Sequence, residues 1–165
     1  KNQKMKFTLL ALTAVASQAF KIGSYDLGPL HASCKMTVTF DSDVCKDVSD
    51  ALADAANDLS GFDSCGSGEK CGYTVSDHSE TDWSGIHETP SKHYKDDLTF
   101  SFSDTGSGGC EAEAYSTSET WYAVLDSGTN YCNLHNLIEH TGLSYSEDVS
   151  DSDCTQYSSA DCEKY

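Results

Sequence analysis

Eight cysteines constrain the fold of this chain more than any other feature of its sequence. They follow an apolar segment in which Lys6 precedes a short hydrophobic run, with small residues such as Ala16 and Ala19 where a signal peptidase would cleave. The run is shorter than the roughly 20 apolar residues of a membrane-spanning helix. An even number of cysteines behind a signal peptide predicts a secreted protein that is held together by disulfides. The predicted half-cystines are Cys34, Cys45, Cys65, Cys71, Cys110, Cys132, Cys154 and Cys162.

Spacing alone does not choose among the roughly 105 ways of pairing eight half-cystines. Two local closures are open to the chain. Cys65 and Cys71 flank a glycine-rich loop, and Cys154 lies close to Cys162 near the end of the sequence. Cys34 and Cys45 bracket the first predicted strand and the start of the first predicted helix. Zinc ligation is the alternative use of these thiols, but the chain has no Cys-x-x-Cys pair and secretion favours disulfides.

Apolar residues in the first half of the chain change from an alternating to a helical spacing. Met36, Val38 and Phe40 alternate with polar residues, which predicts a half-buried strand over residues 35–40. The spacing from Val44 to Leu59 then predicts a helix over residues 43–60. We expect Asp43 at its N-cap and Gly61 at its C-terminal end.

The second half of the chain is predicted to be mostly strands. The candidate strands cover residues 71–76, 83–87, 98–103, 110–115 and 121–125. A second helix is expected to have Thr129 or Asn130 as its N-cap and to end at Gly142. This order of elements predicts an α+β fold with an antiparallel sheet of about four to six strands, two helices on one face, and disulfide stabilisation.

The same patterns divide the chain into segments. The chain that remains after removal of the signal peptide is long enough for one domain, which would bury about 70% of the surface that the unfolded chain exposes. The predicted organisation is upstream read-through at 1–4, a signal peptide at 5–19, one α+β domain at 20–143, and an acidic, serine-rich tail at 144–165 tied by Cys154 and Cys162.

The charge balance of the chain is strongly acidic. The formal net charge is −17, and there is no arginine among the ten basic residues. Removal of Lys1, Lys4 and Lys6 with the leader leaves seven lysines against 27 acidic residues, a balance of −20. This charge repels nucleic acid and anionic membranes, and it attracts cations, cationic polymers and the calcium sites of a mineral. The alternative is that the charge serves only to keep the protein soluble.

The densest acidic cluster lies in the predicted tail. Calcium needs several hard oxygen ligands within one loop, and extracellular sites bind it with about millimolar affinity. A weak calcium site is therefore predicted there, and calcium is the one cofactor that the sequence suggests. The alternative is a solvated tail without a bound ion. The candidate ligands are Glu147, Asp148, Asp151 and Asp153.

Catalytic motifs are not found, and we expect the protein not to be an enzyme. His135 and His140 stand five residues apart on different helix faces, so they do not fit a zinc-metalloprotease helix. No Gly-x-Ser-x-Gly sequence occurs. The residual candidate for chemistry is a group of four residues that fall close together before a predicted strand. These are His87, His93, Asp96 and Asp97.

The leader, the acidic arginine-free chain and the eight cysteines together resemble small secreted shell-matrix proteins of bivalve molluscs. Residues 117–134 and 154–162 are similar to uncharacterised secreted invertebrate proteins. Strongly mineral-directing proteins of that kind are richer in aspartate and less globular. The resemblance therefore implies a folded component of an extracellular, calcified matrix, and it transfers no site residue.

Two functions follow as expectations. The first is a secreted structural or interaction protein of the matrix, with matrix polymers or a calcium mineral surface as its partner and no contact with nucleic acid or membrane. The alternative is a secreted disulfide-rich binding module, such as an inhibitor, defence or mucus protein, that acts through loops 61–70 or 104–109.

Overall fold

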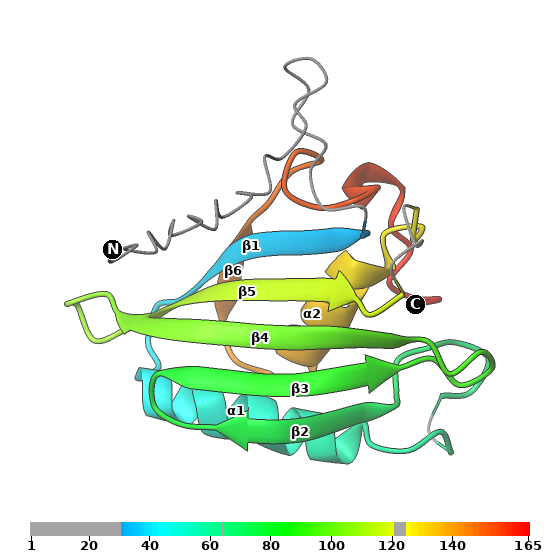
Figure 1. The fold of residues 1–165 in the computed structure, drawn as a ribbon. Coiled ribbons are helices and arrows are strands. Elements are labelled where there is room, and N and C mark those ends of the chain that lie inside the picture. The colour runs from blue at the N-terminus through cyan, green and yellow to red at the C-terminus, as the bar shows by residue number, and fades with distance from the viewer. Residues whose placement is uncertain (1–30, 64, 121–124) are drawn as a thin grey trace, which may run out of the picture.

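The computed structural model describes residues 31–63, 65–120 and 125–165. These residues form a six-stranded antiparallel sheet with both helices on one of its faces (Figure 1). The elements in chain order are β1 (Ser33–Phe40), α1 (Cys45–Asp58), β2 (Tyr73–His78), β3 (Asp82–Glu88), β4 (Lys95–Asp104), β5 (Cys110–Ser118), α2 (Thr129–His140), β6 (Tyr145–Asp148) and the short 3-10 helix η1 (Tyr157–Ser159). The predicted fold class is therefore confirmed.

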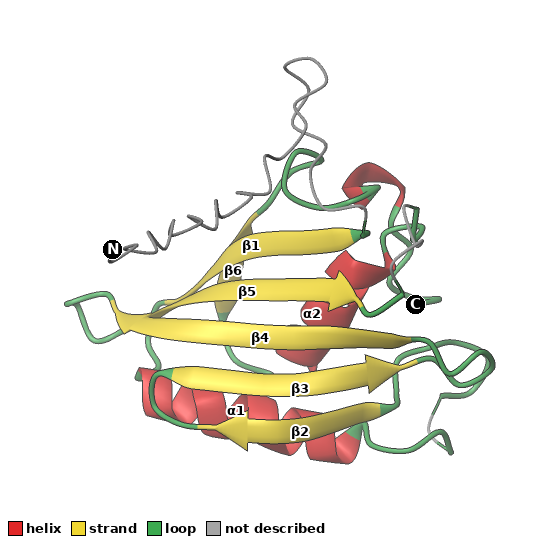
Figure 2. Ribbon diagram, viewed as in Figure 1, coloured by secondary structure: helices red, strands yellow, loops and turns green. Residues whose placement is uncertain are grey.

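The sheet joins the beginning and the end of the described chain. Strands β2 to β5 follow one another as antiparallel neighbours, and the full order is β2-β3-β4-β5-β1-β6. Strand β1 lies between β5 and β6, with Phe40 opposite both Cys110 and Tyr145. Figure 2 shows α1 behind β2 and β3, and α2 behind the β5 side of the sheet. One face of the sheet is packed against helices, and no described helix or strand covers the other.

The core lies between the sheet and the two helices. Alternate residues of each strand point into it, so Leu98, Phe100 and Phe102 of β4 are buried while the residues between them are exposed. Helix α1 contributes its predicted apolar stripe, including Val48 and Leu52. Each such side chain contributes about 1.5–3 kcal/mol by leaving water. The other large buried apolar side chains are Phe40, Val38, Tyr73, Trp83, Leu134, Leu137 and Ile138.

The helix ends differ in detail from the sequence prediction. Helix α1 begins at Cys45 after Val44, not after an Asp43 cap, and no side chain caps its free amides. A disulfide joins Cys45 to Cys110 and so places the first residue of the helix beside the start of β5. Helix α2 begins at Thr129, and its N-cap is Gly128 in place of the predicted Thr129 or Asn130. The backbone amide of Asn130 in its first turn donates to the carboxylate of Asp126 at 2.9 Å.

All eight cysteines pair in four disulfides: Cys34–Cys154, Cys45–Cys110, Cys65–Cys71 and Cys132–Cys162. The predicted closure of Cys65 on Cys71 is confirmed, and the closure of Cys154 on Cys162 is wrong. The reason is topological. Cys154 lies beside Cys34 at the start of β1, and Cys162 faces α2. Both cysteines of the C-terminal segment therefore tie it to the rest of the fold.

The segment after residue 143 contributes one strand to the sheet. Strand β6 pairs with β1 over four residues, and the backbone amide of Lys35 donates to the carbonyl of Asp153 at 3.0 Å. Residues 1–4 and 5–19 lie outside the described part of the chain, as do four residues of the predicted strand 121–125. No helix in residues 31–63, 65–120 and 125–165 is long and apolar enough to cross a bilayer.

Candidate functional site

The face of the sheet that lies away from the helices is not covered by any described helix or strand. We call it the open face, and Figure 1 is viewed onto it. Its side chains are hydroxyl and acidic groups with two lysines, one tyrosine and one isoleucine. The outward-facing residues of its strands other than β2 are Asp82, Ser84, Ile86 and Glu88 of β3; Lys95, Asp97, Thr99, Ser101 and Ser103 of β4; Glu111, Glu113, Tyr115 and Thr117 of β5; Ser33, Lys35, Thr37 and Thr39 of β1; and Ser146 and Asp148 of β6.

The pairing register places carboxylates in a row across the open face. Asp82 lies opposite Ser101, Ser101 opposite Glu113, Glu113 opposite Thr37, and Thr37 opposite Asp148. Neighbouring strands are about 4.8 Å apart, so carboxylates on alternate strands recur about every 10 Å. We call Asp82, Glu113 and Asp148 the carboxylate row. Hydroxyl groups separate its members, and Lys35 forms an exposed ion pair with Glu113 at 3.1 Å.

The four carboxylates that the sequence suggested as calcium ligands are placed in different environments. Asp148 belongs to the carboxylate row, whereas its neighbour Glu147 points to the opposite side of the sheet and contacts α2. Asp151 accepts the backbone amide of Ser158 at 2.7 Å, and Asp153 accepts the hydroxyl of Ser150. Within the part of the chain that the structure describes, no three His, Cys, Asp or Glu side chains are grouped to hold a metal ion.

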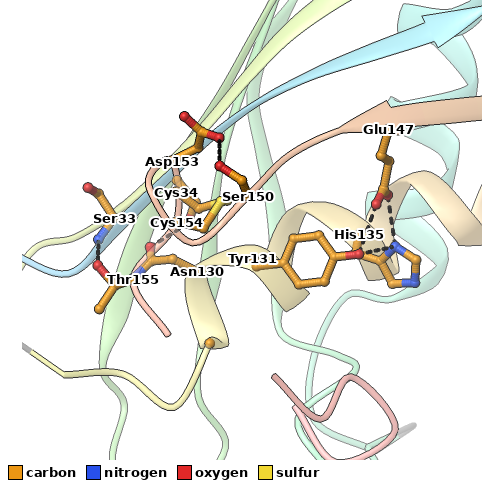
Figure 3. Close-up of a disulfide and its surroundings, with 12 residues drawn as sticks. Ser33, Cys34, Asn130, Tyr131, His135, Glu147, Ser150, Asp153, Cys154 and Thr155 are labelled. Atoms are coloured by element: carbon orange, nitrogen blue, oxygen red, sulfur yellow. Dashed lines mark hydrogen bonds and ion pairs between the residues drawn. A yellow bond between two sulfur atoms is a disulfide. The ribbon is translucent and has the colours of Figure 1, made fainter. Parts of the chain in front are cut away.

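Glu147 forms a polar contact with two residues of α2 (Figure 3). The hydroxyl of Tyr131 donates to one carboxylate oxygen at 2.8 Å, and Nδ1 of His135 donates to the other at 2.8 Å. The Tyr131 and His135 rings stack with their centroids 5.3 Å apart. The hydrogen bond to Glu147 raises the pKa of His135, and burial raises the pKa of Tyr131. This contact attaches β6 to α2.

The raised pKa of His135 makes the unfolding free energy depend on pH. A group whose pKa is higher in the folded state stabilises the fold fully below its unfolded pKa, near 6.5, and less as the pH rises through the folded pKa. We expect wild type to lose unfolding free energy through this group as the pH rises from 6 to 9. Urea unfolding of His135→Gln should lack that loss. His140→Gln, on an exposed histidine 3.7 Å from Asp58, is the control. Equal pH profiles for wild type and His135→Gln would contradict the assignment.

The four residues His87, His93, Asp96 and Asp97 do not form a single site. His87 is fully buried and bonds the carbonyl of Glu69 through Nε2 at 3.0 Å, and burial lowers its pKa. His93 is exposed and contacts Glu88 at 2.6 Å. Asp96 points into the protein and Asp97 out to the open face. Only His87 and Asp96, which are opposite each other in the β3–β4 register, lie on the same face.

Asp96 lines a pocket of about 430 Å³. Residues from the ends of β4 and β5, the start of α2 and the segment before β2 line it, among them Glu69, Lys92, Tyr94, Asp96, Ser118 and Thr129. Behind the pocket, the side-chain amide of Asn133 donates to Oδ2 of Asp96 at 2.7 Å, and Tyr73 donates to the carbonyl of Asn133 at 2.9 Å. The sequence carries a signal for this burial, because Asp96 is in phase with Leu98 and Phe100.

Comparison of the chain with protein-family models, with curated proteins and with solved structures finds no match in any of the three.

Proposed function

We propose that this protein is a secreted component of an extracellular, calcified matrix and that it associates with calcium-bearing surfaces through its open face. The observation that carries the proposal is the carboxylate row, Asp82, Glu113 and Asp148, held by sheet register on a face that no described element covers. The four disulfides fit a protein that works outside the cell. The resemblance to bivalve shell-matrix proteins points to shell as the mineral.

The physical argument is one of rigidity and repetition. Backbone pairing fixes where each outward side chain starts, so the face loses less conformational entropy on adsorption than a disordered acidic tail would. Each exposed ionic contact contributes only about 0.2–1 kcal/mol, and several contacts on one rigid face add up. The net charge of −17 raises the concentration of cations around the protein. We therefore propose that calcium binds weakly at many points of the open face and not at one closed site. Of the acidic residues 147–153, Asp148 is the one that lies on this face.

Adsorption to calcium carbonate tests this proposal. We expect the triple variant Asp82→Asn, Glu113→Gln and Asp148→Asn to adsorb about fivefold more weakly than wild type, because three exposed ionic contacts of a few tenths of a kcal/mol each are lost. The control changes three acids elsewhere by the same charge, namely Asp54→Asn, Asp58→Asn and Glu163→Gln. The measurement is the adsorption isotherm on calcite powder at fixed ionic strength.

The two triple variants distinguish an effect of the open face from an effect of net charge. If both adsorb equally weakly, net charge alone governs adsorption and the open face has no special role. If wild type does not adsorb at all, the mineral function is wrong and the secreted binding module takes first place. The specific observation in favour of that second function is the pocket beside Asp96, which the open face does not include.

A further inference from the structure

We propose that the pocket beside Asp96 is a binding site for a small organic cation with an ammonium group. This inference does not rest on the proposed mineral function, because the pocket lies on the helix side of the sheet and shares no residue with the carboxylate row. Its volume of about 430 Å³ is within the range of about 300–1,000 Å³ that small-molecule sites occupy.

The central observation is a buried carboxylate with one oxygen to which no described residue donates a hydrogen bond. The Asp96 residue is only 5% exposed, and among the described residues its one hydrogen-bond donor is Asn133, which bonds Oδ2. No described group donates to Oδ1. Asp96 lines the pocket, so its carboxylate is available to a ligand bound there. A buried carboxylate costs free energy unless a donor or a cation pairs with it.

Two other groups of the pocket wall can also accept a hydrogen bond from a ligand. The Thr129 hydroxyl donates its hydrogen to the carbonyl of Asp126, so its lone pairs remain to accept a bond. Burial and the charge of Asp96 raise the pKa of Glu69, the second carboxylate on the wall. By contrast, the carboxylate of Asp126 already accepts hydrogen bonds from backbone amides at the start of α2. The carboxylates of Asp96 and Glu69 and the hydroxyl of Thr129 therefore favour a ligand that donates hydrogen bonds.

The charge and shape of the site select among donors. The carboxylates of Glu69 and Asp96 outnumber the one lysine that lines the pocket, Lys92, so the net charge of the wall is negative. A bare metal ion is a poorer fit, because the described residues offer no group of three charged or imidazole ligands. Tyr94, half exposed and part of the pocket wall, adds an aromatic ring that can bind a cation or an apolar part of the ligand. A ligand whose ammonium group pairs with Oδ1 of Asp96 and whose short organic part contacts Tyr94 fits both the charge and the shape of the pocket.

Benzylamine is the probe that tests this site, and benzyl alcohol is its neutral counterpart. We expect saturable benzylamine binding with a dissociation constant of about 1 mM, which is typical of a ligand with so few atoms. Backbone amide shifts in a titration followed by NMR should map to Ser118 and Thr129. Asp96→Asn keeps an acceptor for Asn133 but removes the charge, and it should weaken binding at least tenfold. Asp97→Asn, the next residue on the opposite face of β4, is the matched control and should leave binding unchanged.

Several results would overturn the proposal. These are no saturable benzylamine binding by wild type, equal weakening by Asp96→Asn and Asp97→Asn, equal binding of benzyl alcohol, or shifts confined to the open face. If Asp96→Asn does not fold, Glu69→Gln replaces it, and we expect that variant to weaken binding at least threefold. A Glu69→Gln variant that binds as wild type would then contradict the assignment. All titrations are run at 0.15 M salt, where nonspecific attraction to the acidic surface is screened.

Discussion

Removing the Cys34–Cys154 disulfide should lower the free energy of unfolding by about 4–5 kcal/mol. The bridge joins residues 120 positions apart and so restricts the unfolded chain strongly, although the other bridges shorten the effective loop. It also holds the start of β1 to the C-terminal segment, where the amide of Thr155 donates to the carbonyl of Ser33 at 2.9 Å. Because domains are stable by only about 5–15 kcal/mol, such a loss is a large part of the total.

Cys65–Cys71 gives the matched control for this prediction. It closes a loop with a separation of 6 residues, and the same chain-entropy relation gives about 2 kcal/mol for its removal. We would compare the double variant Cys34→Ala/Cys154→Ala with Cys65→Ala/Cys71→Ala by urea unfolding under oxidising conditions. Equal losses, or a larger loss for the short loop, would contradict the view that Cys34–Cys154 is the more stabilising cross-link.

The regular elements were predictable where one face is apolar. Leu98, Phe100 and Phe102 alternate, and the apolar stripe from Val48 to Leu59 has helical spacing, so the sequence alone placed β4 and α1 within a few residues of their observed bounds. Such patterns are local consequences of burying one face of a strand or helix, and they need no knowledge of the partner.

Strand β6 was not predicted because its burial depends on partners distant in sequence. Its residues Tyr145–Asp148 include two acids and a serine, a composition that is typical of an acidic tail. The strand forms because β1 has a free edge and because Glu147 contacts Tyr131 and His135 on α2. A carboxylate that is bonded by two side chains from another element looks identical in sequence to one in solvent. The long-range disulfides were hidden for the same reason.

The two candidate surfaces differ in how much of them the sequence contained. The alternation in β4 and β5 already places Asp97, Ser101 and Glu113 on one polar face, but only the register shows that the acids of β3, β5 and β6 form a row. For the pocket, the strand phase marks Asp96 as inward. Its partner Asn133 comes from α2, 37 residues later, and only the fold brings the two together.

Replacing Trp83 by alanine is the other change for which we expect a large effect, about 3–5 kcal/mol. Its indole is 1% exposed and contacts Phe100 edge to face, with the ring centroids 5.5 Å apart. The ring also covers Gly85, where an added Cβ would lie 2.5 Å from the indole and 2.7 Å from the carbonyl of Thr74. Gly85→Ala should therefore cost about 1–3 kcal/mol in wild type through overpacking.

The two changes should not add, because they act on the same space. In the Trp83→Ala background, the indole that the new methyl group would contact is absent. Gly85→Ala should therefore destabilise that variant by at least about 1 kcal/mol less than it destabilises wild type. Ile86→Ala, the neighbouring change on the open face, is the control for a strand substitution outside the core and should cost under about 1 kcal/mol in either background. The measurement is a double-mutant cycle in urea. Additive costs would show that Gly85 is required by the Thr74 carbonyl alone, and that the indole adapts to the extra methyl group.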